Sequence, residues 1–397
     1  MSCSKKSPFR LIPVCLVLLL GACGEAFEES PAEPASTSGG AERKIIYPAE
    51  FAEGSPFSPG VLAGDTLYLA GQVGRDQATR ELPEDIASQT RLAMENIGFI
   101  LKAAGLNYPN LVKCHVLLDD MDNYSPMNET YGGLFEPGGY PARTTLEIAG
   151  LVGTAHVEIS CIAFADKSRI EVVRPAEGTI PAAMGPYSPG VRAGDALYLS
   201  GQGGRDPETN EIAESVGAQA AQAVQNIHEV VKAAGLGLED VVYTNAYFLG
   251  CGKRAELDSA FASSFPAGVT PPRSNLCLPR LPGTISTEIT FFAGKGRQVD
   301  DTVYLPVRSS PESGSDIASQ MSGTMEKLGK DLRDAGLDYS NAVNANVYLK
   351  NSDDFQGMNG VFREIFANNP PARTTVAILQ EGDHEQILVE VALIAVK

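Results

Sequence analysis

Three arginines recur in almost the same local sequence, at Arg143, Arg273 and Arg373. Each follows Pro-Ala or Pro-Pro and precedes a threonine or a serine. A guanidinium matches a carboxylate through two parallel hydrogen bonds, which suits arginine to binding small acids. An arginine kept at one place in a repeated unit therefore predicts a repeated binding site for a small carboxylate.

One glutamate follows each arginine within a segment of β-strand pattern. Glu158, Glu288 and Glu390 lie 15, 15 and 17 residues after the respective arginines. Turn-forming residues stand midway, so we expect the last two strands of each unit to form a hairpin, with arginine and glutamate near each other across it. A carboxylate beside a bound acid could orient a water molecule or move a proton. The alternative is a structural ion pair, although such pairs on a surface contribute little.

The arginines and glutamates belong to three long internal repeats. Residues 61–72 match residues 191–202, and the sequence of residues 85–89 returns unchanged at 316–320. Repeats also occur in solenoids, but each unit here, at roughly 100 residues or more, is long enough to build its own core. We expect three domains, the third degenerate and shortened at its N-terminal end, over residues 43–166, 167–296 and 297–397.

The elements that must position these side chains can be predicted within one repeat. Apolar residues at steps of three or four over 86–104 predict a helix that Gly105 ends. Alternating residues over 112–118 predict a half-buried strand. A second helix and two closing strands are expected at 122–135, 144–149 and 156–165. The order is β-β-α-β-α-β-β, an α+β unit whose helices cover one face of a sheet.

The N-terminus has the layout of a secretory signal over residues 1–22, with a basic start and an apolar run. Residues 19–23 resemble the lipobox of bacterial lipoproteins, which implies lipidation of Cys23 and attachment to a membrane. By the same analogy Gly24 favours the outer membrane, on the periplasmic side. A transmembrane anchor is the alternative, but the apolar run is short and contains Pro13. Residues 23–42 have the polar, Pro- and Gly-rich composition of a disordered tether.

Charge and residue composition exclude several classes of partner. The formal charge is −18, and removing residues 1–22 lowers it to −21 because three basic residues are lost. Such a surface repels phosphate backbones, so we do not expect nucleic acid as a partner. The four histidines are isolated and no H-E-x-x-H motif occurs, so no metal site is expected. The remaining cysteines could form two disulfides or stay as buried thiols: Cys114, Cys161, Cys251 and Cys277.

Several motifs, in their order and spacing, resemble the RidA family of reactive-intermediate deaminases, also called YjgF-like proteins. They are Gly-Pro-Tyr-Ser-Pro-Gly at 185–190, Leu-Tyr-Leu-Ser-Gly-Gln at 197–202, Pro-Pro-Arg-Ser at 271–274 and the Glu-Ile strand that starts at Glu288. The resemblance covers the chain after residue 44 three times over. It implies a chorismate-mutase-like fold. Family members form homotrimers with ligand clefts between subunits, so three tandem copies imply a covalent pseudo-trimer that is monomeric in solution.

The resemblance also implies an activity and roles for particular residues. Family members hydrolyse enamines and imines such as 2-aminoacrylate to 2-keto acids and ammonia, without metal or organic cofactor. Matching the motifs makes the three arginines carboxylate anchors and the three glutamates helpers of the attacking water. It adds substrate-binding positions at Gly71, Ser200, Gly201, Tyr187, Asn128 and Asn359. The cysteine usual in the family two residues after the arginine is Thr145, Asn275 or Thr375 here.

The three copies are not equivalent. Phe57 stands where repeat 2 has Tyr187, and Asp258 stands at the asparagine position, where we expect it to repel an anionic substrate. Pro306 and Val307 replace Ser200 and Gly201 in repeat 3. Because repeat 2 keeps most family features, we expect Arg273 to be the foremost functional arginine and Arg143 the next. A purely structural role is considered for Arg373.

Two functions from different classes fit these observations. The first is an exported enamine or imine deaminase, and the second is a non-catalytic binder or sensor of small carboxylates on the same fold. The arginines suit both, so only turnover separates them. An endoribonuclease activity, attached to some relatives, is disfavoured by the strong negative charge.

Overall fold

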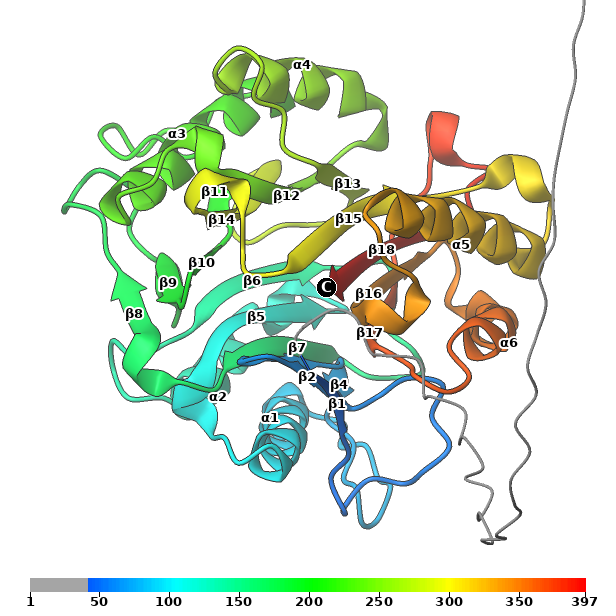
Figure 1. Ribbon diagram of the computed structural model, residues 1–397. Helices are drawn as coiled ribbons and strands as arrows, with labels where there is room; N and C mark the ends of the chain where they lie inside the picture. Colours follow the sequence, from blue (N-terminus) through cyan, green and yellow to red (C-terminus); the bar gives the residue numbers. More distant parts are fainter. Residues whose placement is uncertain (1–41) are drawn as a thin grey trace, which may run out of the picture. The chain divides into compact units, whose positions relative to one another are not determined.

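The computed structural model describes residues 42–397, and the three repeats lie in one compact unit, Gly40–Lys397 (Figure 1). The predicted signal, Cys23 and nearly all of the predicted tether lie outside the described residues. No helix among residues 42–397 is long and apolar enough to cross a membrane.

Repeat 1 forms a sheet in the order β1-β2-β3-β7-β5-β6, with β4 also paired to β7. Its elements are β1 Arg43–Ile46, β2 Gly60–Ala63, β3 Thr66–Leu69, β4 Gln72–Val73, α1 Ile86–Ala103, β5 Leu111–Leu118, α2 Tyr124–Gly132, β6 Ala142–Glu147 and β7 Val157–Phe164. The Asp85 side chain accepts a hydrogen bond of 2.8 Å from the Ser88 amide and caps α1. Gly105, at a φ of 76°, ends that helix as predicted.

Repeat 2 has the same arrangement, in the order β13-β12-β14-β10-β9-β8 with β11 paired to β14. Its elements are β8 Ile170–Val173, β9 Gly190–Ala193, β10 Ala196–Leu199, β11 Gln202–Gly203, α3 Val216–Ala233, β12 Val241–Phe248, α4 Arg254–Ser264, β13 Arg273–Cys277 and β14 Thr287–Gly294.

Repeat 3 is shorter and forms a four-stranded sheet, β15-β18-β16-β17. Its elements are β15 Thr302–Arg308, α5 Ile317–Asp334, β16 Ala342–Leu349, α6 Phe355–Ile365, β17 Ala372–Ala377 and β18 Val389–Val396. The predicted α+β class with three tandem copies is therefore confirmed (Figure 1).

Each sheet buries one face against its own pair of helices. In repeat 1, Ile97 of α1 and Met127 of α2 pack on Val116 and Ile159, and equivalent clusters exist in repeats 2 and 3. The other faces pack against one another, because one cluster contains the equivalent tyrosines Tyr68, Tyr198 and Tyr304. Three separate cores and two shared cores make the chain a covalent pseudo-trimer.

The predicted hairpin is wrong. Strands β6 and β7 do not pair, because β5 lies between them: Cys114 of β5 is opposite Arg143 of β6, and Leu117 of β5 is opposite Glu158 of β7. Strands β5 and β6 are parallel and are joined through α2, as a parallel pair requires a crossover connection. The predicted helix between them was the signal for this parallel pairing. The arginine and glutamate of one repeat therefore lie on strands that are not neighbours.

Two disulfides resolve the alternative left open by the cysteines. Cys114 and Cys161 are directly opposite each other on β5 and β7 and are bonded, and Cys251 is bonded to Cys277 of β13. Their sequence separations are 47 and 26 residues. Both bonds join segments within one repeat, so they stabilise repeats 1 and 2 and not the contacts between repeats.

Reducing these disulfides is expected to lower the free energy of unfolding. Loop closure in the unfolded chain predicts losses of about 4 and about 3.5 kcal/mol for the two separations. The measurement is a denaturant titration of the full chain with and without a strong reductant. The double variant Cys114→Ala/Cys161→Ala should keep only the response to the reductant that comes from the Cys251–Cys277 disulfide. A wild-type midpoint that the reductant leaves unchanged would contradict the assignment.

Candidate functional site

The arginine of repeat 1 lies beside the glutamate of repeat 2, and the arginine of repeat 3 lies beside the glutamate of repeat 1. The Gly201 amide donates to the Arg143 carbonyl at 3.1 Å, and the Gly71 amide donates to the Arg373 carbonyl at 3.0 Å. We name the three sites by their repeats. The 1–2 cleft contains Arg143 and Glu288, and the 3–1 cleft contains Arg373 and Glu158. By equivalence along the repeats, we call the surroundings of Arg273 and Glu390 the 2–3 cleft.

The 1–2 cleft is a cavity of about 70 Å³ that Arg143, Tyr187, Gly201 and Glu288 line together. Arg143 is 3% exposed. Its guanidinium carbon lies 5.1, 5.8 and 6.0 Å from the ring centroids of Tyr131, Tyr187 and Tyr124. These aromatic faces favour the cation and hold it away from bulk water. Tyr187 of repeat 2 thus serves Arg143 of repeat 1, and not Arg273 of its own repeat.

Glycine at positions 71 and 201 makes room for a glutamate. A Cβ on Gly201 would lie 1.8 Å from Oε1 of Glu288, and a Cβ on Gly71 would lie 1.8 Å from Oε1 of Glu158. No side chain can therefore replace these glycines while the carboxylates keep their places.

Ser200, the residue before Gly201, is fully buried. Its Oγ accepts a hydrogen bond of 2.8 Å from the Arg143 amide and donates one of 2.6 Å to the Ser188 carbonyl. Its contacts in the structure are with the backbone that carries Arg143. Ser200 therefore fixes the position of strand β6, which carries Arg143, against repeat 2.

The carboxyl of Glu288 has an unusual pKa. Burial raises its pKa to about 7, and the positive charges of Lys113 and Arg143 limit that rise. A carboxyl group with a pKa near neutrality can both take and return a proton under physiological conditions. Burial raises the pKa of the equivalent Glu158 further, to about 8, although the charge of Arg373 opposes this rise.

Lys113 is a residue of this site that the sequence analysis missed. It is buried under the 1–2 cleft, where burial lowers its pKa to about 7. Its Nζ donates to Oγ1 of Thr144 at 2.7 Å, to the Leu199 carbonyl at 2.8 Å and to Oγ1 of Thr290 at 3.3 Å. It therefore ties strand β6, which carries Arg143, to strand β10 of repeat 2. A lysine inside an apolar strand pattern was the available signal.

Several buried polar side-chain atoms near the two open clefts lack hydrogen-bond partners among the described residues. In the 1–2 cleft these are Nη1 of Arg143, Oδ1 of Asn128 and Oγ1 of Thr145, and in the 3–1 cleft Oδ1 of Asn359 and Oγ1 of Thr375, none of which has a hydrogen-bond partner among the described residues. Leaving such atoms unpaired costs about 1–3 kcal/mol each. A polar ligand that bonded to them would recover this free energy.

The 3–1 cleft repeats this arrangement in a larger cavity of about 560 Å³. Arg373 is 3% exposed, and its guanidinium carbon lies 4.6, 4.9 and 5.6 Å from the ring centroids of Phe362, Phe57 and Phe355. Burial lowers the pKa of Arg373 to about 9, although Glu158 opposes this shift. Arg373 therefore has a buried, aromatic environment similar to that of Arg143.

In the 2–3 cleft, the arginine is paired with a side chain of its own repeat. Arg273 forms an ion pair with Asp258, and Nδ2 of Asn275 donates to the same Asp258 oxygen at 2.9 Å. Val307 occupies the place of the glycine, and Oε2 of Glu390 accepts a hydrogen bond of 3.0 Å from Nε2 of Gln380. Of the three predicted arginines, Arg273 is the one whose guanidinium forms an ion pair with a carboxylate among residues 42–397. Asp258 thus neutralises the arginine that the sequence ranked first.

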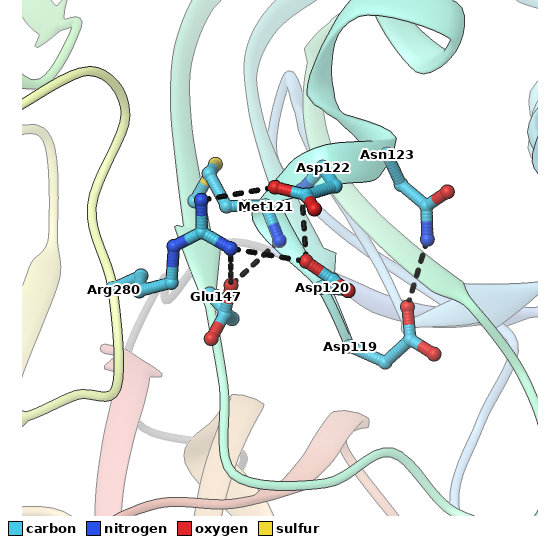
Figure 2. Close-up of polar contacts among 7 residues, drawn as sticks. All are labelled: Asp119, Asp120, Met121, Asp122, Asn123, Glu147 and Arg280. Carbon is cyan, nitrogen blue, oxygen red and sulfur yellow. Dashed lines mark hydrogen bonds and ion pairs between the residues drawn. The ribbon is translucent and has the colours of Figure 1, made fainter.

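An ion-pair network holds a loop of repeat 2 against repeat 1 beside the 1–2 cleft. Figure 2 shows the Arg280 guanidinium between three acids of repeat 1, at 3.1 Å from Asp120, 3.0 Å from Asp122 and 3.6 Å from Glu147. Oε2 of Glu147 also accepts from the Met121 amide at 2.6 Å. The same loop carries Pro282 and Ile285 into the cleft lining. Arg280 therefore helps to fix one wall of the cavity.

No group of three or more His, Cys, Asp or Glu side chains placed to hold a metal ion occurs among residues 42–397. The chemical groups that line the open clefts are guanidiniums, carboxyls, amides and hydroxyls. They can bind a small acid and transfer protons.

Comparison with known proteins assigns the family. The family model described as Endoribonuclease L-PSP matches residues 48–165, 178–295 and 305–397. The chain belongs to this family and carries its unit three times. Among curated relatives, the 2-iminobutanoate/2-iminopropanoate deaminase of Bos taurus is 42% identical over 123 residues, which cover 30% of this chain and 89% of the relative. The human protein of the same name is 36% identical over 124 residues, with 30% and 89% covered. The predicted RidA relationship is therefore confirmed.

Solved structures of similar proteins each cover about one repeat. The YjgF gene product of E. coli is 32% identical with a TM-score of 0.30, covering 32% of this chain and 98% of that chain. The structure of E. coli TdcF with bound serine is 33% identical with a TM-score of 0.29, covering 31% and 99%.

Proposed function

We propose that this protein hydrolyses 2-imino acids to 2-keto acids and ammonia, and that the 1–2 cleft is its principal active site. The observation that carries the proposal is the meeting, in one buried cavity, of an unpaired Arg143 donor and a carboxyl whose pKa is about 7. The names of the curated relatives support imine deamination at the level of the family.

The residues of the 1–2 cleft suit each step of this reaction. Arg143 binds the substrate carboxylate through its free donor, and the Asn128 and Thr145 oxygens are available for the substrate's N–H groups or for the water. Ionised Glu288 takes a proton from water as the water oxygen bonds to the imine carbon. That proton passes to the imine nitrogen, which gives the neutral carbinolamine. Glu288 then takes the hydroxyl proton of the carbinolamine and transfers it to nitrogen as the C–N bond breaks, so that the C=O group of the keto acid forms and ammonia leaves. Each proton taken from water is returned, so Glu288 ends the cycle ionised.

The other two clefts differ in their fitness for this chemistry. The 3–1 cleft keeps the arginine, the glutamate, the glycine and the asparagine, with Phe57 in place of Tyr187. In the 2–3 cleft, Asp258 forms an ion pair with the arginine, and Val307 replaces the glycine. We infer that two clefts bind substrate and that the 2–3 cleft does not.

The test is to generate imino acids in situ from amino acids with an amino-acid oxidase and to follow their hydrolysis by the purified full chain. Release of ammonia and keto acid faster than the spontaneous rate is expected. Arg143→Ala/Arg373→Ala, which disables both open clefts, is the matched control. Keto-acid binding without any acceleration would overturn the enzyme proposal and leave a carboxylate binder.

Asp258→Asn is expected to create a carboxylate site in the 2–3 cleft. Asparagine stands at the equivalent positions 128 and 359, and it would release the Arg273 guanidinium from its internal partner. In an Arg143→Ala/Arg373→Ala background, calorimetry should detect 2-oxobutanoate binding only after Asp258→Asn, and more strongly with Val307→Gly added. Asp122→Asn, which removes an exposed acid elsewhere, should give no binding. Binding in the background without Asp258→Asn would show that Asp258 does not block the cleft.

We further infer that the protein is exported and anchored by a lipid on Cys23. The signal layout of residues 1–22 supports this, and so do two disulfides, which persist in oxidising compartments. Cys23→Ser should release the protein from the membrane fraction or leave it unprocessed, as seen by fractionation and mass spectrometry. A variant with unchanged membrane attachment and mass would argue against lipidation at this cysteine.

A further inference from the structure

The two open clefts are built from equivalent residues but differ strongly in size. The cavity of the 3–1 cleft is about 560 Å³ and that of the 1–2 cleft about 70 Å³. The difference in cavity volume arises in the segment that precedes Phe57 in repeat 1 and Tyr187 in repeat 2. Residues from this segment line both cavities, including Met184 in the 1–2 cleft and Gly54 in the 3–1 cleft.

Three contacts hold this segment over the 1–2 cleft. The Tyr124 hydroxyl is 3.5 Å from the Met184 carbonyl, and the Met184 amide is 3.4 Å from the Tyr187 hydroxyl. Pro186 packs directly on Gly132 of α2, where an added Cβ would lie 3.1 Å from the proline ring. The segment therefore narrows the cavity around Arg143, and a short ligand fits the remaining space.

Every one of these contacts is lost in the 3–1 cleft through a change of residue. A constant offset along the repeats places Gly54 at the position of Met184 and Phe57 at that of Tyr187. On α6, Phe355 stands at the position of Tyr124 and Arg363 at that of Gly132. Both hydroxyls and the covering Met side chain are absent. A guanidinium replaces the glycine on which the segment packs.

Arg363 adds an unpaired cation to the rim of the larger cleft. It lines the cavity with Arg373, and its charge contributes to lowering the Arg373 pKa, so the two guanidiniums are close enough to repel each other. Arg363 is exposed and has no ion pair or hydrogen bond with another described residue. By contrast, Arg75 and Arg80, which also line the cavity, donate to the Arg80 carbonyl at 2.7 Å and to Oε1 of Gln77 at 2.8 Å.

The acids of the same lining leave the cavity with an excess of positive charge. Glu53 and Glu158 are the two acidic residues of the cavity, against four arginines. Burial raises the pKa of Glu158 to about 8, so this carboxyl carries little charge near neutrality. A cavity with two neighbouring cations, neither of which forms an ion pair with a described residue, favours a ligand with two anionic groups.

We propose that the 3–1 cleft is a site for longer 2-keto and 2-imino acids that carry a second carboxylate, which Arg363 recognises. Arg373 binds the first carboxylate, and the carbon chain lies along the Phe57 and Phe355 rings. The 1–2 cleft selects short monocarboxylic acids. This assignment rests on the proposed function for the first carboxylate, and adds the second anionic subsite and the division of substrates between the two clefts.

The test compares two acids of equal chain length, 2-oxoglutarate and 2-oxopentanoate, by calorimetry on the full chain. Arg143→Ala removes the 1–2 cleft from the measurement. In that background we expect 2-oxoglutarate to bind roughly tenfold more tightly than 2-oxopentanoate, as one additional charge-assisted contact would give. Adding Arg363→Gln should abolish the preference. Lys102→Gln, the same change of charge on an exposed residue of α1, should preserve it.

Equal affinities for the two acids in the Arg143→Ala background would overturn the proposal. So would a preference for 2-oxoglutarate that survives Arg363→Gln. Arg373→Ala added to Arg143→Ala should eliminate binding of both acids, and residual 2-oxoglutarate binding would place it elsewhere. Hydrolysis of imino acids by the wild type distinguishes a failure of this proposal from a failure of the proposed function, because it tests the proposed function without depending on Arg363.

Discussion

In a chain that carries Arg373→Ala, the further change Arg143→Ala is expected to weaken 2-oxobutanoate binding by roughly ten- to a hundred-fold. Arg373→Ala confines the measurement to the 1–2 cleft. Loss of a hydrogen-bonded charge pair costs on the order of 1.5–3 kcal/mol, which corresponds to this range of affinity. The estimate suits Arg143, because its guanidinium is buried and has an unpaired donor.

The chain supplies a matched control in Arg273→Ala. Arg273 has the same local sequence and a position in an equivalent strand, but it is paired with Asp258. Its removal should therefore leave 2-oxobutanoate binding in the 1–2 cleft unchanged. Arg143→Lys keeps the charge and loses the planar fork, so it should be impaired as well. Thermal melts establish that each variant is folded.

Two outcomes would contradict this assignment. Unchanged binding in folded Arg143→Ala would make this arginine a structural residue. A loss of binding in Arg273→Ala equal to that in Arg143→Ala would restore the ranking given by the sequence. Either outcome would show that the unpaired donor of Arg143 and the ion pair of Arg273 do not decide which arginine binds the acid.

The sequence predicted well those features that depend on local pattern. The three copies, the helix ended by Gly105 and the strand at residues 112–118 follow from spacing and composition within one repeat. Arg143 with Glu288, and Arg373 with Glu158, also line cavities, as their recurrence suggested. Each of these predictions needed residues close together in the chain.

The pairing of the charges could not be obtained in this way. Arg143 and Glu158 are close in sequence, but β5 separates their strands, and the glutamate beside Arg143 is Glu288, which belongs to another repeat. Which strand lies between two others is decided by packing across the whole sheet and not by the turn that joins them. This misplacement also explains why repeat 2 seemed most complete: its Tyr187 and Gly201 serve the arginine of repeat 1.

Differences between the clefts were visible in the sequence, but their effects were not. Asp258 was expected to repel a substrate anion, whereas the structure places it in an ion pair with Arg273. Lys113 was absent from the prediction because its acceptors come from three strands in two repeats. A buried charge is explained only by the partners that the fold brings to it.

The largest effect on turnover is expected from Glu288→Gln. In the Arg373→Ala background this change should reduce imino-acid hydrolysis by roughly a hundred- to ten-thousand-fold, the usual contribution of general acid–base catalysis. Glutamine keeps the shape of the side chain, so 2-oxobutanoate binding should remain within a few fold of the parent. Glu390→Gln is the matched control, because Glu390 lies in the 2–3 cleft, bonded to Gln380.

The pH dependence gives this prediction a second measurement. Glu288 must be ionised to take a proton from water, so activity should rise as the pH increases through about 7, and the residual activity of Glu288→Gln should lack this rise. Stability should change in the opposite direction. A pKa raised from 4.5 to about 7 means that burial favours the neutral acid. Its stabilising contribution is present below pH 4.5 and is lost as the pH rises through about 7.

Glutamine cannot ionise, so Glu288→Gln should gain stability relative to the wild type over that same interval, by up to about 3 kcal/mol. Thermal melts at pH 5 and pH 9 measure the difference. Loss of turnover together with this gain in stability at high pH would identify a buried carboxyl kept for catalysis at a cost in folding free energy. Turnover that survives Glu288→Gln, with the wild-type pH profile, would show that another group activates the water and that Glu288 only completes the charge balance around Arg143 and Lys113.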